Sequence, residues 1–283
     1  MRIALPASLL IVTALAASAG SAAAGEAIKH PTARTMVVLR VSSGGGFVTP
    51  QTNLRALPSF TLYGDGSVIV PGPVIQIYPG PALTPLVRSK LDEGAVQAVL
   101  ARAKAAGLLA PRGIDYGGMG AVGVSDMPTT TLVVNAAGKR FKRQAYALGA
   151  PAQGGRLSPA QARARKALQQ FIAGLPHGAS GAVSPPHAVA VYVAPFRGQA
   201  QPGSVPIVWP LKSNLATAGK PVSSGLGYRC IGVAGKPAKT LLAALSKANE
   251  QSRWKARAGA KATYEVVARP LLPDERGCPP PVG

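Results

Sequence analysis

Residues 57–81 read LPSFTLYGDGSVIVPGPVIQIYPGP, and they contain the strongest indications of β-structure in the chain. Apolar and β-branched residues lie on both sides of Gly64-Asp65-Gly66, and glycine supplies the positive φ angles that a tight turn requires. The pattern therefore predicts a β-hairpin. A third strand is predicted at Val74–Tyr78, between Pro71-Gly72-Pro73 and Pro79-Gly80-Pro81, because proline ends a strand on either side.

The segments on both sides of this hairpin complete a mixed pattern of strands and helices. Leu91–Leu109 repeats apolar residues every three or four positions, and Ser158 followed by proline is typical of the start of a helix, which we expect to run to Leu175. Further strands are predicted at Thr35–Val41, Thr129–Val134 and Arg140–Tyr146. The last of these alternates only weakly, which indicates a half-exposed, basic strand.

A stretch rich in Pro, Gly and Ser, residues 177–187, reads as a linker to a second domain. Beyond it the pattern predicts strands at Ala188–Ala194, Val205–Leu211, Tyr228–Val233 and Thr263–Ala268, with a helix from Pro237 to Asn249. The expected fold class is α+β, with domains at 33–176 and 188–283. Each domain is predicted to be an antiparallel sheet with one or two packed helices.

The first 25 residues, MRIALPASLLIVTALAASAGSAAAG, have the layout of a secretory signal peptide. One positive charge precedes a short apolar run, and small residues suited to signal peptidase follow. The run is too short to span a bilayer comfortably. We therefore expect cleavage between Ala22 and Ala27, and a soluble protein secreted to, or retained at, the cell envelope.

The chain is strongly basic, with 31 Lys and Arg against 10 Asp and Glu and a formal net charge of +21. Such an excess favours anionic partners, which for an exported protein are anionic cell-wall polymers or an anionic lipid surface. The basic residues are scattered, without interleaved aromatics or a nucleic-acid motif, which favours a compositional bias over a dedicated surface. No nucleic acid is expected as a partner.

Few residues are available for catalysis, since the chain has three histidines, two cysteines and ten acids. No histidine has a second ligand at metal-binding spacing, so neither a metal nor a cofactor is predicted. The candidate functional loops contain Asp65, Asp115, Tyr116 and Asp126, which lie beside strands or in a glycine-rich stretch. The structural alternative is that Asp65 and Asp126 accept hydrogen bonds from backbone N–H groups in turns.

Cys230 and Cys278 are the only cysteines in the chain. Because an exported chain meets an oxidising compartment, we expect them to form a disulfide bond. Cys278 follows the last predicted strand by a proline-rich tail that has little periodicity of its own. The bond would therefore hold this tail against the strand that contains Cys230.

Six segments together resemble a family of exported actinobacterial proteins of unassigned function. They are GGGFV (44–48), LPSFTLYGDGSVI (57–69), IYPGPAL (77–83), DY (115–116), DMPTTTLVV (126–134) and RPLLPDERGC (269–278). The resemblance implies no activity and no binding residue. The leading hypothesis is therefore a non-enzymatic binding or structural protein of the cell envelope. The alternative is a cell-wall hydrolase or transferase that uses the loop carboxylates.

Overall fold

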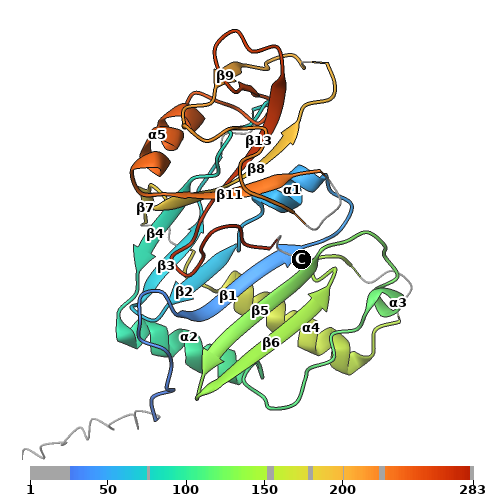
Figure 1. The fold of residues 1–283 in the computed structure, drawn as a ribbon. Helices are drawn as coiled ribbons and strands as arrows, with labels where there is room; N and C mark the ends of the chain where they lie inside the picture. Colours follow the sequence, from blue (N-terminus) through green and yellow to red (C-terminus); the bar gives the residue numbers. More distant parts are fainter. Residues whose placement is uncertain are drawn as a thin grey trace, which may run out of the picture.

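Two sheets, each with mainly antiparallel strands, make up the fold in the computed structural model (Figure 1). The structure describes residues 26–74, 77–151, 156–177, 181–199, 201–222 and 227–280. Helices accompany both sheets, so the predicted α+β class is confirmed. The predicted signal peptide lies outside the described residues. No helix among these residues has both the length and the hydropathy needed to cross a bilayer.

The first sheet has the strand order β6-β5-β1-β2-β3-β4-β7. Its strands are β1 (Val37–Gly44), β2 (Phe60–Tyr63), β3 (Ser67–Pro71), β4 (Leu86–Lys90), β5 (Thr129–Ala136), β6 (Lys139–Tyr146) and β7 (Ala182–Ser184). All of its neighbouring strands are antiparallel. The strand β7 is formed by part of the predicted linker and pairs with β4.

The hairpin predicted from residues 57–71 is confirmed as β2 and β3. Gly66 has a φ of +81°, and a Cβ atom there would lie 2.2 Å from the carbonyl oxygen of Leu91, so the turn requires glycine. The prediction of a strand at Val74–Tyr78 is wrong for the described part of that segment. Residues 75–76 are not described, and Val74, Ile77 and Tyr78 are exposed and lie outside any strand.

The strand that follows β3 in the chain and pairs with it is instead β4, Leu86–Lys90. The N–H of Gly72 already donates to the carbonyl of Pro85, 2.8 Å away, which starts the pairing with β4 at that point. The described residues between Pro73 and Pro81 therefore lie outside any strand. Local β-propensity predicted a strand there, but pairing with a more distant segment decided the outcome.

Helices α2 (Glu93–Ala105) and α4 (Pro159–Ala173) cover one face of the first sheet (Figure 1). Both begin at side chains that cap the helix: Asp92 accepts from the N–H of Ala95, and Ser158 forms a capping box with Gln161. Their buried residues join those of the strands in one hydrophobic core. The short helix α3 (Met119–Val122) lies between α2 and β5 in the chain.

The second sheet has the order β10-β11-β8-β13-β12-β9. Its strands are β8 (Ala188–Pro195), β9 (Pro206–Val208), β10 (Lys220–Pro221), β11 (Arg229–Ala234), β12 (Arg253–Lys255) and β13 (Thr263–Pro270). One face contributes to a core with helix α5 (Gly235–Leu245) and the edge-to-face pair Trp209–Trp254. Among the described strands of this sheet, β9 and β12 are the one parallel pair.

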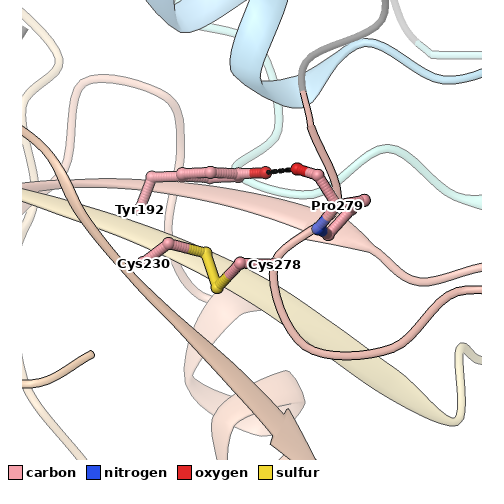
Figure 2. Close-up of a disulfide and its surroundings, with 4 residues drawn as sticks. All are labelled: Tyr192, Cys230, Cys278 and Pro279. Atoms are coloured by element: carbon pink, nitrogen blue, oxygen red, sulfur yellow. Dashed lines mark hydrogen bonds between the residues drawn. A yellow bond between two sulfur atoms is a disulfide. The ribbon is translucent and has the colours of Figure 1, made fainter. Parts of the chain in front are cut away.

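The other face of the second sheet packs against helix α1 (Pro50–Arg55) and the C-terminal tail that follows β13. Leu54 and Leu271 are buried in that core, and Leu272 is buried with Tyr63 and Ile69 of the first sheet. The tail therefore lies in contact with both sheets. Figure 2 shows the predicted disulfide between Cys230 and Cys278, which fixes the tail to β11.

Candidate functional site

Asp115, Tyr116 and Asp126 lie at one end of the first sheet, where β1 ends and β5 begins. The buried guanidinium of Arg165 donates to the carbonyl oxygens of Tyr116 and Tyr146, 3.0 Å away in each case. The hydroxyl of Tyr146 in turn accepts from the N–H of Met127 at 3.1 Å. The two loops that contain these candidates are thus held to the same strand end by Arg165 and Tyr146.

The carboxylate of Asp115 is occupied by local hydrogen bonds. It accepts from the N–H of Gly117 and from the side chain of Gln161, both at 2.8 Å, and these two bonds lower the pKa of Asp115. Tyr116 is buried, and burial raises its pKa. An acidic carboxyl and a buried phenol of raised pKa are both poorly suited to exchange protons near neutral pH.

Asp126 departs from the structural role predicted for it. Its carbonyl oxygen, rather than its carboxylate, accepts a hydrogen bond, from the N–H of Phe47 at 3.0 Å. The residue has a φ of +57°, in the left-handed region that aspartate, asparagine and glycine adopt most readily. The sequence predicted that the Asp126 carboxylate accepts hydrogen bonds in a turn. The structure instead explains the aspartate by its left-handed backbone conformation.

Asp65 lies at the opposite end of the sheet. It follows Tyr63, which pairs with Val37 at the start of β1, whereas Gly44 at the end of β1 pairs with Thr129. Seven residue steps along a strand correspond to about 23 Å. The Asp65 carboxylate accepts from the N–H and hydroxyl of Ser67 at 3.0 and 2.9 Å, and these bonds lower its pKa although partial burial opposes the shift.

The structure therefore brings Asp115, Tyr116 and Asp126 to one end of the sheet and leaves Asp65 at the other. Two cavities among the described residues are lined by none of the four. Within the same residues, no three His, Cys, Asp or Glu side chains gather as a metal site would require. A functional role of these loops stays a prediction.

The larger cavity lies where β1 begins and β5 turns into β6, and it has a volume of about 710 Å³. Its lining comes from the N-terminal segment before β1, the β5–β6 turn and the C-terminal tail. The lining residues are Lys29, His30, Pro31, Thr35, Met36, Val37, Asn135, Ala136, Gly138, Lys139, Arg140 and Asp274.

The carboxylate of Asp274 is the only acidic group in this lining, and it is already bound. Arg40 and the hydroxyl of Tyr63 each donate to its Oδ1 atom at 2.7 Å. Burial followed by the charge of Asp274 raises the pKa of Tyr63, so the phenol keeps its proton. Burial alone would lower the pKa of Arg40, but its hydrogen bond to Asp274 and the attraction of that carboxylate raise it.

The exposed lysine and arginine side chains of the cavity have no such partner. Lys29, Lys139 and Arg140 take part in none of the ion pairs among the described residues, and Lys142 extends the positive charge along β6. His30 at the rim bonds the carboxylate of Glu93 at 3.0 Å. The cavity therefore presents an excess of positive charge to solvent.

Sequence reasoning did not find this site. Arg40 and Asp274 are 234 residues apart, and no periodic pattern connects a strand residue with a residue in the tail. One part of it did have a sequence indication: Arg140–Tyr146 was predicted to be a half-exposed, basic strand. Arg140, Lys142 and Gln144 are indeed exposed, while Phe141, Arg143 and Ala145 are buried on the other face.

Comparisons of the chain with protein families, with curated proteins and with solved structures each gave no match. The resemblance to exported actinobacterial proteins stays a prediction.

The left-handed conformation of Asp126 leads to a first testable prediction. Asp126→Val should lower the free energy of unfolding by about 1–2 kcal/mol, because a β-branched residue is strained at positive φ. Asp126→Asn should change it little, and Asp126→Gly should leave it equal or raise it. Urea unfolding measures the differences. Ser125→Val is the control at a neighbouring exposed position, and equal effects of valine and glycine at 126 would contradict the argument.

Proposed function

We propose that this protein is an exported, non-enzymatic binding module for anionic cell-wall polymers. The observation that carries the proposal is the cavity of about 710 Å³, whose exposed cations lack carboxylate partners while its only carboxylate is held by Arg40 and Tyr63. A polymer with repeated phosphate or carboxylate groups supplies the missing negative charge. The net charge of +21 adds a long-range attraction toward the same class of ligand.

The spacing of the basic residues suits a chain of charges better than one small anion. Arg140 and Lys142 lie on the same face of β6, so their backbone positions are about 6.6–6.8 Å apart. Lys139 precedes them at the cavity and Lys29 lies on the facing segment. An anionic polymer can therefore enter the cavity and continue along β6, with each anionic group meeting a separate cation.

The disulfide supports the extracytoplasmic part of the proposal. Cys230 and Cys278 are joined, and such bonds persist in oxidising compartments but are rare in the cytosol. The signal-peptide pattern of residues 1–25 agrees with this location. Cell-wall polymers are the anionic partners that an exported protein meets there.

The test is binding of the mature chain to purified teichoic acid across a salt series. Neutralising Lys139, Arg140 and Lys142 together with glutamine should weaken binding about tenfold or more at physiological ionic strength, and should reduce the slope of log Kd against log salt. Each cation that contacts the polymer releases a counterion, so fewer contacts give a smaller slope.

The matched control removes three charges elsewhere. Lys236, Lys239 and Lys247 are exposed on and beside α5, and their replacement by glutamine changes the net charge by the same amount. An equal loss of affinity in both triple variants would overturn the assignment of the site. Binding that ignores salt would contradict the electrostatic argument. Stronger binding to vesicles containing phosphatidylglycerol than to teichoic acid would assign the surface to lipid instead.

A further inference from the structure

The strand β6 leaves a long edge of the first sheet open. It is the last strand of the sheet on that side and pairs only with β5 (Figure 1). It contains eight residues, whereas the other three edge strands, β7, β9 and β10, contain two or three each. Proteins normally keep edge strands short or covered, because an open edge can pair with another chain.

The β5–β6 turn determines which backbone groups point away from the sheet. Ala137 and Gly138 have φ values of +50° and +69°, typical of a two-residue type I′ turn. Such a turn makes Ala136 and Lys139 a hydrogen-bonded pair. Along the ladder, hydrogen-bonded pairs then alternate with pairs whose N–H and C=O groups point away from the partner strand. Consequently the N–H and C=O groups of Arg140, Lys142 and Gln144 point outward.

No backbone hydrogen bond among the described residues joins these three residues to a segment outside the sheet. Their side chains are exposed too. The open edge ends at Tyr146, whose carbonyl oxygen accepts from the buried Arg165. The pairing of β5 with β6 runs without a register shift, so no bulge interrupts the edge.

We propose that β6 binds an extended segment of a partner protein, with acidic residues at alternate positions, as an additional strand. The outward N–H and C=O groups of Arg140, Lys142 and Gln144 supply the backbone hydrogen bonds. In the added strand, the residues opposite Arg140 and Lys142 lie on the same face of the sheet as these two cations. Two carboxylates spaced two residues apart in that strand can therefore contact both of them. The residue between these two carboxylates lies on the face of the buried Phe141, so an apolar or β-branched side chain is preferred there.

Charge argues against a second copy of this chain at the same edge. An antiparallel pair of β6 strands centred on Lys142 places this lysine opposite itself, and it places Arg140 opposite Gln144. Like charges directly opposite each other destabilise a pair of strands. The basic residues thus hinder self-association of the edge, and they attract an acidic segment.

This inference shares Arg140 and Lys142 with the proposed function but depends on a different property. Polymer binding needs only the charges, while strand addition also needs the outward backbone groups. A change that blocks those groups and keeps every charge therefore separates the two proposals.

Gln144→Pro is such a change. Proline removes the outward N–H of residue 144 without removing a bond to β5, a position at which edge strands tolerate it. Gln144→Ala is the matched control, because it also removes the side-chain contact to Thr131 but keeps the N–H. Both variants retain Lys139, Arg140 and Lys142.

The probe is a fluorescently labelled ten-residue peptide that alternates glutamate with valine and threonine. Anisotropy at physiological ionic strength should show binding to the wild type and to Gln144→Ala, and at least tenfold weaker binding to Gln144→Pro. A peptide N-methylated at the glutamates, and one of the same composition with all glutamates clustered at one end, should also bind at least tenfold more weakly. Binding of teichoic acid should be unchanged in Gln144→Pro, and a cooperative urea-unfolding transition like that of Gln144→Ala shows that the variant is folded.

Equal binding of the alternating, clustered and N-methylated peptides would overturn the proposal, because charge alone would then explain the interaction. Binding of the alternating peptide that Gln144→Pro leaves unchanged would overturn it as well. A dimer in light scattering that Gln144→Pro dissociates would assign the edge to a second copy. Slowed hydrogen exchange at the amides of Arg140, Lys142 and Gln144 on peptide addition is the direct positive result.

Discussion

Replacing Cys278 with serine is expected to lower the free energy of unfolding by about 4 kcal/mol. The disulfide to Cys230 joins positions 48 residues apart, and closing a loop of this length restricts the unfolded chain by about that amount in the chain-entropy description. Cys278 itself is exposed.

The structural consequence should be local release of the tail. Near the bond, the hydroxyl of Tyr192 donates to the carbonyl of Pro279 at 3.0 Å, as Figure 2 shows. Gly277 lies so close to Gly232 that a Cβ atom on Gly232 would be 2.6 Å from its Cα. Without the disulfide these contacts must be maintained by the tail alone, against the conformational entropy of an exposed segment.

Urea unfolding of the wild type, of Cys278→Ser and of Cys230→Ser/Cys278→Ser measures the loss. The double variant avoids a free thiol, and the wild type treated with a reductant should unfold at the same urea concentration as the double variant. Arg276→Ala, at an exposed neighbour in the tail, is the control and should change stability little. A reduced wild type as stable as the oxidised form would show that the bond contributes nothing.

The elements that sequence reasoning predicted well are those whose pattern is local. The β2–β3 hairpin follows from Gly66, whose conformation is available to almost no other residue, and α4 follows from the cap at Ser158. The disulfide followed from there being only two cysteines in the chain. In each case, a few neighbouring residues or a simple pairing rule contained the information.

The errors and omissions arise where distant segments compete or combine. Val74–Tyr78 has strand-forming residues, yet the next strand along the chain is β4, which pairs with β3. The cavity combines the N-terminal segment, the β5–β6 turn and Asp274, and no local pattern connects these three. The acidic loops were predicted as functional candidates because carboxylates are chemically active. In the structure, Asp65 and Asp115 accept hydrogen bonds from backbone N–H groups in turns, and Asp126 has a left-handed backbone conformation.

Glu275→Ala is also expected to have a large effect, lowering the free energy of unfolding by about 3–5 kcal/mol. The guanidinium of Arg269 is 3% exposed and donates to both carboxylate oxygens of Glu275 at 2.8 Å. Its Nε atom donates to the carbonyl of Ala56, also at 2.8 Å, so this arginine connects β13 to the segment after α1. Removing the carboxylate leaves a buried charge without a counter-ion, which costs far more than a surface pair does.

Glu275 also fixes the bend in the tail, because its carboxylate accepts from the N–H of Leu272 at 2.9 Å. The control is Glu93→Ala, which removes a solvent-exposed carboxylate that contacts His30 and Gln97, and it should cost at most about 1 kcal/mol. The double variant Arg269→Met/Glu275→Leu should recover much of the lost stability, since it removes both charges and keeps apolar volume.

Glu275→Ala and Cys278→Ser should not be additive, because both changes loosen the same tail. In urea unfolding, the combined variant should lose less than the sum of the single losses by more than about 0.5 kcal/mol. Strict additivity would indicate that the ion pair and the disulfide stabilise independent parts of the protein. A loss for Glu275→Ala no larger than that for Glu93→Ala would show that water replaces the carboxylate beside Arg269.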